Sequence, residues 1–157
     1  MIAVVQRVAR ASVRVEGELV GEVGRGVLVL LGVLKGDGEA EMQRLARKVA
    51  GLRLFADERG RMQHDLGAIG GGALVVSQVT LAADGRKGRR LSLDRAAEPE
   101  RARELYRAFA AELEALGVPT QRGRFGASMQ VELVNDGPVT CVLEEPPRRP
   151  ESSQALS

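Results

Sequence analysis

The sequence has few of the side chains on which common hydrolases depend. Its 157 residues include one histidine, one cysteine and no tryptophan, and aromatic residues make up only 3%. A Ser-His-Asp triad needs a histidine base, but His64 lies in a polar stretch typical of the protein surface. One histidine and one cysteine also fall short of the three protein ligands usual in zinc sites. The sequence therefore predicts neither a histidine-based triad nor a metal site.

Other absences exclude further kinds of site and further classes of protein. Because Cys141 is the only cysteine, an internal disulfide is excluded, and its apolar neighbours indicate a buried structural thiol. No Gly-rich phosphate loop of the Walker type occurs, so kinases and ATPases are disfavoured and no cofactor is expected. The chain shows no leader peptide and no apolar run of the roughly 18 residues that a membrane span needs. These absences favour a cytoplasmic protein without a membrane partner.

The hydrophobic pattern is typical of one α/β domain. With 44% hydrophobic residues, a chain of this length can bury a core without disulfides or a structural metal. Apolar runs predict strands, and apolar residues at helical spacing predict two amphipathic helices. The predicted strands cover 2–15, 19–20, 27–33, 52–55, 73–76, 129–134 and 139–143, and the predicted helices cover 39–50 and 99–116. We expect the domain to span 1–145 and the Pro- and Ser-rich segment 146–157 to be a disordered tail.

One segment concentrates positive charge, although the net charge is only +2. Residues 84–95 carry five cations against two acids, and their glycines let the segment conform to a partner. The cations are Arg86, Lys87, Arg89, Arg90 and Arg95. Such a segment is typical either of a surface that binds nucleic-acid phosphates or of a solvated loop.

A Ser-Gln-Val-Thr segment at 77–80 follows one of the predicted strands. Side chains alternate between the faces of a strand, so Ser77 and Thr80 converge only if the chain turns near Gln78. Hydroxyl, amide and main-chain N–H groups can orient a substrate and stabilise an oxyanion, but they do not create a strong base. Such a site could hydrolyse only an already reactive bond, and the aminoacyl ester on the terminal ribose of tRNA is one.

A second segment, Asn-Asp-Gly-Pro-Val-Thr at 135–140, lies between two predicted strands. Proline fixes φ and lacks an N–H, so Gly137-Pro138 alone predicts a turn. Together, the two segments and their flanks resemble the D-aminoacyl-tRNA deacylase family over residues 1 to about 145. The similar flanks are 3–8, 55–57, 60–62, 81–84, 86–88 and 123–129. Departures are Val79, where many relatives have Phe, and Leu-Ser-Leu at 91–93, where they have Pro-Ser-Phe.

The resemblance implies a fold and a reaction. The expected fold is a three-layer α/β domain of mainly antiparallel and mixed sheets with two helices on one face, assembled as a homodimer. The expected reaction is hydrolysis of the ester bond of D-aminoacyl-tRNA, and of glycine mischarged on alanine tRNA, which gives chiral proofreading in translation. A rigid backbone wedge that excludes an L side chain would not exclude glycine.

The resemblance also implies roles for individual residues. Gly137 and Pro138, joined by a cis bond, would enter the partner subunit's pocket as the chirality filter. Ser77, Gln78 and Thr80 would be catalytic, with main-chain amides and the tRNA 2′-hydroxyl sharing the work. Phe125 would lie near the terminal adenosine, with Ala127 and Met129 in the same pocket. Arg86, Lys87, Arg89 and Arg90 would bind the tRNA.

Two other interpretations remain open from the sequence. The chain could be a non-enzymatic RNA-binding module that uses its basic segment, with both motifs serving only as turns. It could also be a small-molecule esterase with Thr80 as the nucleophile and Lys87 as its base.

Overall fold

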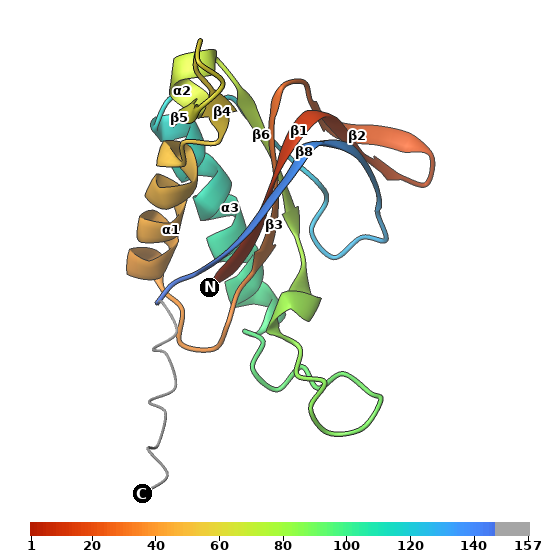
Figure 1. Cartoon of the computed structure of the whole chain (residues 1–157). Coiled ribbons are helices and arrows are strands. Elements are labelled where there is room, and N and C mark those ends of the chain that lie inside the picture. The colour runs from red at the N-terminus through yellow and green to blue at the C-terminus, as the bar shows by residue number, and fades with distance from the viewer. Residues whose placement is uncertain (147–157) are drawn as a thin grey trace, which may run out of the picture.

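A computed structural model of the chain describes residues 1–146 and shows a mixed sheet with helices on one face (Figure 1). The strands of the sheet are β1 (Ile2–Val15), β2 (Glu18–Val23), β3 (Gly26–Gly32), β6 (Gly72–Ser77), β7 (Thr120–Arg122) and β8 (Gln130–Glu144). β4 (Phe55–Ala56) and β5 (Met62–His64) form a separate hairpin. The helices are α1 (Glu39–Gly51), α2 (Leu66–Ile69) and α3 (Pro99–Ala115), and η1 (Val79–Ala82) is a short 3₁₀ helix. Within residues 1–146, no helix has the length and apolar character to cross a lipid bilayer.

The strand order of the sheet is β2-β1-β3-β6-β7, with β8 also paired to β1. β1 is antiparallel to β2, β3 and β8, whereas β3, β6 and β7 run parallel. Gly26 and Gly72 begin the first parallel pair, and a Cβ on Gly26 would overlap the main chain of Gly72. Because β3 and β6 are parallel, Leu31 and Ser77 lie side by side where the two strands end.

Apolar residues on both faces of the sheet form two cores. One cluster, which includes Val5, Val75 and Phe109, lies between the sheet and the helices α1 and α3. The other, which includes Val13 and Leu74, lies on the opposite face, where the ends of β1, β2 and β8 curve over (Figure 1). The resulting layers of helices, sheet and curved sheet end confirm the predicted three-layer α/β fold.

The two long helices lie within one residue of their predicted limits. α1 buries Met42 and Val49, and the main-chain N–H of Gly38 donates a hydrogen bond of 2.9 Å to the Glu41 carboxylate at its first turn. α3 has Pro99 in its first turn, where a missing N–H costs no helical hydrogen bond, and it buries the predicted stripe that includes Phe109. Both helices pack their apolar faces on the sheet.

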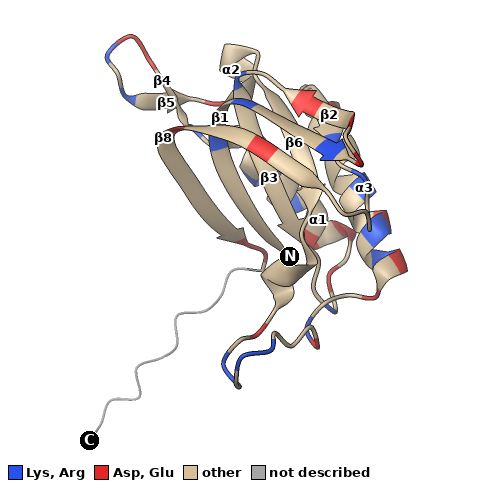
Figure 2. Ribbon diagram, turned by 90° about the vertical axis from the view of Figure 1, so that its right-hand side faces the viewer, with Lys and Arg blue, Asp and Glu red and all other residues tan. Residues whose placement is uncertain are grey.

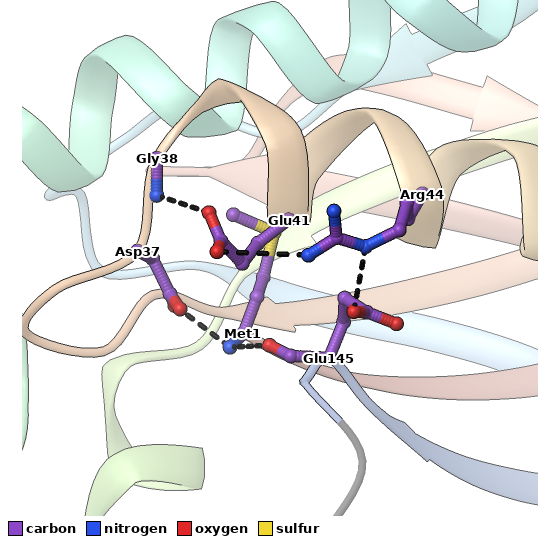
Figure 3. Close-up of polar contacts among 6 residues, drawn as sticks. All are labelled: Met1, Asp37, Gly38, Glu41, Arg44 and Glu145. Atoms are coloured by element: carbon purple, nitrogen blue, oxygen red, sulfur yellow. Dashed lines mark hydrogen bonds and ion pairs between the residues drawn. The ribbon is translucent and has the colours of Figure 1, made fainter.

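The first residue is tied to the end of β8 and to the loop before α1 (Figure 3). The α-ammonium of Met1 lies 2.7 Å from the carboxylate of Asp37 and donates a hydrogen bond of 2.6 Å to the Glu145 carbonyl. Arg44 of α1 donates to the Glu145 carboxylate at 2.8 Å. The Met1 and Asp37 side chains are 0% and 5% exposed, so this ion pair is buried.

The predicted strand at 52–55 is wrong, because β4 begins only at Phe55. The Leu52 N–H bonds back to the Val49 carbonyl at 3.4 Å, and the Leu54 N–H bonds to the Leu52 carbonyl at 3.1 Å. These local bonds use the N–H groups that a strand would donate to its neighbour. β4 pairs with β5 instead, and His64 lies in this exposed strand, which confirms its predicted surface position.

Three further features differ from the sequence prediction. A third helix, the four-residue α2, is capped by the preceding Asp65, whose carboxylate accepts from the Ala68 N–H at 2.9 Å. The segment 135–140 is not an open turn, because β8 runs through it and merges two predicted strands. Cys141 is half-buried rather than fully buried, and its burial raises the pKa of its thiol. The predicted tail at 146–157 lies outside the described residues except for Pro146.

Candidate active site

The segment after β6 turns sharply, as the convergence of its side chains requires. The Gln78 N–H donates to the Leu31 carbonyl at 2.8 Å, which holds the chain against the end of β3. The next residues form η1, and the Leu81 N–H donates back to the Gln78 carbonyl at 3.2 Å. The predicted turn near Gln78 is therefore confirmed.

This turn brings the Gln78 and Thr80 side chains together. The Gln78 amide nitrogen Nε2 donates a hydrogen bond of 2.5 Å to Oγ1 of Thr80. Because the Thr80 oxygen accepts this bond, its own O–H is left to donate to another oxygen atom. Ser77 is half-buried at the strand end, while Thr80 is exposed to solvent. The arrangement offers hydrogen-bond donors next to one another, as oxyanion stabilisation requires.

A cavity of about 510 Å³ opens beside Ser77 and Gln78. Its size is in the range of small-molecule sites, and apolar side chains dominate its wall. The structure places three predicted pocket residues, Phe125, Ala127 and Met129, in this wall. Thr80 does not line the cavity, but its hydroxyl oxygen is hydrogen-bonded to Gln78, which does.

Tyr106 of α3 also lines the cavity, a role that its helical spacing alone does not predict. Its single O–H is shared between the main-chain carbonyls of Val75, at 3.0 Å, and Gly123, at 3.2 Å. Burial raises the pKa of the Tyr106 phenol to about 12, so it remains a neutral donor. Its ring centroid lies 5.8 Å from that of Phe125. Tyr106 thus holds the segment that carries Phe125 against β6. The one sequence feature that sets Tyr106 apart from its core neighbours is that it is the only tyrosine in the sequence.

The predicted RNA-binding cations lie on an exposed loop below η1, shown in blue at the lower end of Figure 2. Main-chain bonds of 2.9 Å in both directions between Asp84 and Ser92 close the base of this loop. The Arg86 guanidinium holds the pKa of Asp84 at about 2, because the two side chains are hydrogen-bonded at 3.0 Å. Arg86 is therefore partly neutralised, whereas Lys87, Arg89 and Arg90 have no ion pair with any residue in 1–146.

The Gly137-Pro138 bond is cis, as the resemblance implies, and it sits in a bulge of β8 opposite Arg7. Arg7 donates through Nε to the Asp136 carbonyl at 2.9 Å, and the Val139 N–H donates to the Asn135 side-chain oxygen at 3.2 Å. Gly137 has a φ of 132°, and a Cβ there would lie 2.9 Å from Nη2 of Arg7. The local contacts therefore favour glycine at this position.

Asn135 and Thr140 hold the two sides of this bulge together. The Asn135 side-chain nitrogen Nδ2 donates to Oγ1 of Thr140 at 3.0 Å, and Gln6 donates to the same oxygen at 3.4 Å. The polar residues of the second motif are thus engaged with one another and with β1. Between them, Gly137 and Pro138 remain exposed.

The two motifs do not meet within one chain. β1 and β3 lie between β8 and β6, which separates the motifs by three strand spacings, or about 14 Å. Along the strands, Ser77 aligns through Leu31 with Ala3, whereas Gly137 lies opposite Arg7. This offset adds about 13 Å at roughly 3.3 Å per residue. Gly137 and Pro138 therefore lie far from the cavity of their own chain.

Comparison with known proteins decides the family. A family model described as D-Tyr-tRNA(Tyr) deacylase matches residues 4–144. The chain belongs to this family. It is 58% identical over 144 residues to the D-aminoacyl-tRNA deacylase of Roseiflexus castenholzii, covering 92% of each chain. It is 55% identical over 144 residues to the enzyme of Aeromonas hydrophila, covering 92% of this chain and 99% of the relative.

Solved structures agree with the fold. The structure titled c-Myc DNA Unwinding Element Binding Protein superposes with a TM-score of 0.87 at 41% identity and covers 92% of this chain and 98% of that one. The structure of a probable eukaryotic D-amino acid tRNA deacylase superposes with a TM-score of 0.79 at 16% identity and covers 90% and 97%.

Family membership makes this chain an enzyme, a D-aminoacyl-tRNA deacylase of the carboxylic ester hydrolases. The alternative of a non-enzymatic RNA-binding module is therefore wrong. The small-molecule esterase alternative gains no support, because in residues 1–146 no hydrogen bond joins Lys87 to Thr80. Within the same range, no group of three or more His, Cys, Asp or Glu side chains is placed to hold a metal ion.

Proposed function

We propose that this deacylase works as a homodimer in which the Gly137-Pro138 bulge of each chain completes the partner's cavity. The observation that carries the proposal is the separation of the two motifs within one chain. The bulge is exposed and braced by Arg7 and Asn135, so it can protrude from its own chain without losing its conformation.

The sheet face away from the helices supports such an assembly. Val142 of β8 pairs with Val4 of β1, and Val4 pairs with Leu30 of β3, so the three form one apolar row across the sheet. Their sequence neighbours pack toward α1 and α3, which places the row on the opposite face. Val142 is 63% exposed. Figure 2 shows little charge on this part of β8, β1 and β3. A two-fold axis here would bury the same row from both chains.

The bulge then acts as the chirality filter. The main-chain carbonyls of Gly137 and Pro138 accept hydrogen bonds from the substrate's α-ammonium, and the backbone excludes the side chain of an L-aminoacyl group. Hydrogen bonds from Arg7 and to Asn135 limit how far the backbone of the bulge can move away from an L side chain. Glycine has no side chain to exclude, so glycine mischarged on alanine tRNA is also a substrate.

Hydrolysis proceeds without a histidine base. Water adds to the ester carbonyl carbon, and donors at Ser77, Gln78 and Thr80, with nearby main-chain amides, stabilise the negative charge on the carbonyl oxygen. The neighbouring 2′-hydroxyl of the ribose assists proton transfer. The bond to the ribose oxygen breaks, that oxygen takes a proton, and free D-amino acid and tRNA are released.

The cavity wall and the basic loop bind the tRNA end. Phe125 stacks on the terminal adenosine, with Ala127 and Met129 completing the wall, and Arg86, Lys87, Arg89 and Arg90 contact phosphates. The reaction discards D-amino acids before they reach translation, which places the enzyme in the cytoplasm with its charged tRNA substrates.

The first experiment compares hydrolysis of D-tyrosyl-tRNA and L-tyrosyl-tRNA by the full chain, with and without a chelator. We expect chelator-insensitive release of the D form alone. Equal release of both enantiomers would contradict the filter.

A subunit-mixing experiment tests the shared site. Gln78→Ala impairs the cavity of its own chain, whereas Gly137→Phe blocks the cavity of its partner. Mixing the two variants creates heterodimers with one intact site, so about one quarter of wild-type activity should return if chains pair at random. No recovery, despite proven heterodimers, would show that each site is built within one chain.

A further inference from the structure

A second basic surface lies beside the cavity, away from the loop at 84–95. It consists of Arg103 and Arg107 of α3, Arg122 at the end of β7, and Arg124 just beyond it. All four side chains are exposed. Within residues 1–146, none of the four forms an ion pair, whereas neighbouring Arg101 is paired with Glu104 at 3.0 Å.

The backbone explains why these four side chains gather. Arg103 and Arg107 are four residues apart, so they lie on the same face of α3. A Cβ on Gly123 would point toward Val13 of β1 and Val76 of β6, each 3.7 Å away, and toward the Met129 sulfur, 2.7 Å away. Arg122 and Arg124, which flank Gly123 in an extended segment, therefore point the other way.

This surface borders a groove that shares a wall with the catalytic cavity. Arg107, Arg122 and Arg124 line the groove, and Tyr106 and Phe125 line both spaces. The Arg103 guanidinium lies over the Phe125 ring, 5.3 Å from its centroid. One carboxylate, Glu114, also lines the groove, so three arginines face one acid. The groove thus carries an excess of positive charge directly behind the ring proposed to stack on the terminal base.

We infer that this arginine surface binds the phosphates of the single-stranded 3′ end of the tRNA, just before the terminal adenosine. The inference rests on the proposed function for the position of the adenosine. A base stacked on Phe125 on the cavity side would place its 5′ phosphate within reach of the neighbouring groove, which Arg107, Arg122 and Arg124 line. Arginine is suited to this contact, because its planar guanidinium binds phosphate oxygens in pairs.

The test removes charge without touching the cavity. The double variant Arg107→Gln/Arg122→Gln is compared with Arg47→Gln/Arg53→Gln, which removes the same charge at exposed positions on α1 and just after it. Uncharged tRNA binding is measured against salt, and kcat and KM are measured with D-tyrosyl-tRNA and with D-tyrosyl-adenosine, which has no phosphates.

For Arg107→Gln/Arg122→Gln we expect KM for D-tyrosyl-tRNA to rise about tenfold with kcat unchanged. The slope of log binding constant against log salt should fall by about 1.4, at 0.7 per single-strand phosphate contact. Hydrolysis of D-tyrosyl-adenosine should not change. An equal loss in the control pair, or an equal loss with D-tyrosyl-adenosine, would overturn the inference.

The measurement of tRNA binding distinguishes failure of this inference from failure of the proposed function. If wild-type protein binds tRNA, and the double variant binds it more weakly, but D-tyrosyl-tRNA is not hydrolysed, the proposed function fails and the phosphate surface stands. If the double variant binds tRNA as tightly as wild type, the surface is wrong whatever the activity.

Discussion

The hydroxyl of Tyr106 donates a hydrogen bond of 3.0 Å to the main-chain carbonyl of Val75, two residues before Ser77. The same hydroxyl donates to the Gly123 carbonyl at 3.2 Å, at the start of the segment that carries Phe125. One side chain of α3 therefore sets the spacing between the strand that ends at the catalytic turn and the far wall of the cavity.

Replacing Tyr106 by phenylalanine removes both hydrogen bonds and keeps the ring. We expect the free energy of unfolding to fall by about 1–2 kcal/mol, because two carbonyls lose a buried donor. KM should rise more than kcat falls, since the cavity wall loosens while Gln78 and Thr80 remain. Denaturant unfolding and steady-state kinetics measure these effects. Phe109→Leu, a change in the same core, should lower stability without the selective rise in KM.

Tyr106 also predicts how stability depends on alkaline pH. Its pKa is raised to about 12 in the folded protein, above the usual value near 10. The unfolded chain therefore loses this proton first as pH rises. The contribution of the neutral phenol is fully present below pH 10 and is lost between about pH 10 and 12. Unfolding measured across this window should show a smaller pH dependence in Tyr106→Phe than in wild type.

The buried pair of Met1 and Asp37 should matter for stability and not for chemistry. Asp37→Asn leaves the α-ammonium without its carboxylate, so we expect a loss of about 3 kcal/mol in the free energy of unfolding. Asp94→Asn, a change at an exposed aspartate, serves as the matched control and should have almost no effect. Activity per folded molecule should stay unchanged, although the catalytic turn lies at the same end of the sheet. A selective fall in kcat would mean that the buried pair also positions that turn.

Thr80→Ala distinguishes a positioning role from a nucleophilic one. We expect kcat to fall about 100-fold, as when one oxyanion donor is lost, because Ser77, Gln78 and main-chain amides remain. A loss of about a millionfold would instead indicate a covalent mechanism through this hydroxyl. Thr120→Ala is the control for removal of a threonine. The Thr120 hydroxyl, on β7, bonds to the nearby Val118 carbonyl.

The sequence predicted the elements that have a strong local pattern. The apolar stripes of α1 and α3 predicted the limits of both helices to within one residue. The alternation of side chains along a strand required the turn found at Gln78. Local pattern could not show that β8 pairs with β1, because that pairing joins residues far apart in the chain. It could not separate Tyr106 from its core neighbours either, since a residue that bridges two carbonyls has the same helical spacing as one that only packs.

The pairing of β1 with β8 also bears on how the chain is made. β1 is made before the other strands of this domain, yet along one edge it pairs from Ile2 to Arg14 with residues 130–144. That edge stays open through most of synthesis, and contacts between such distant residues slow folding. Formation of the cavity is delayed as well, because Met129 and Val131 in its wall belong to the same late segment. The cavity of this domain is therefore complete only after residues 129–144 have been made.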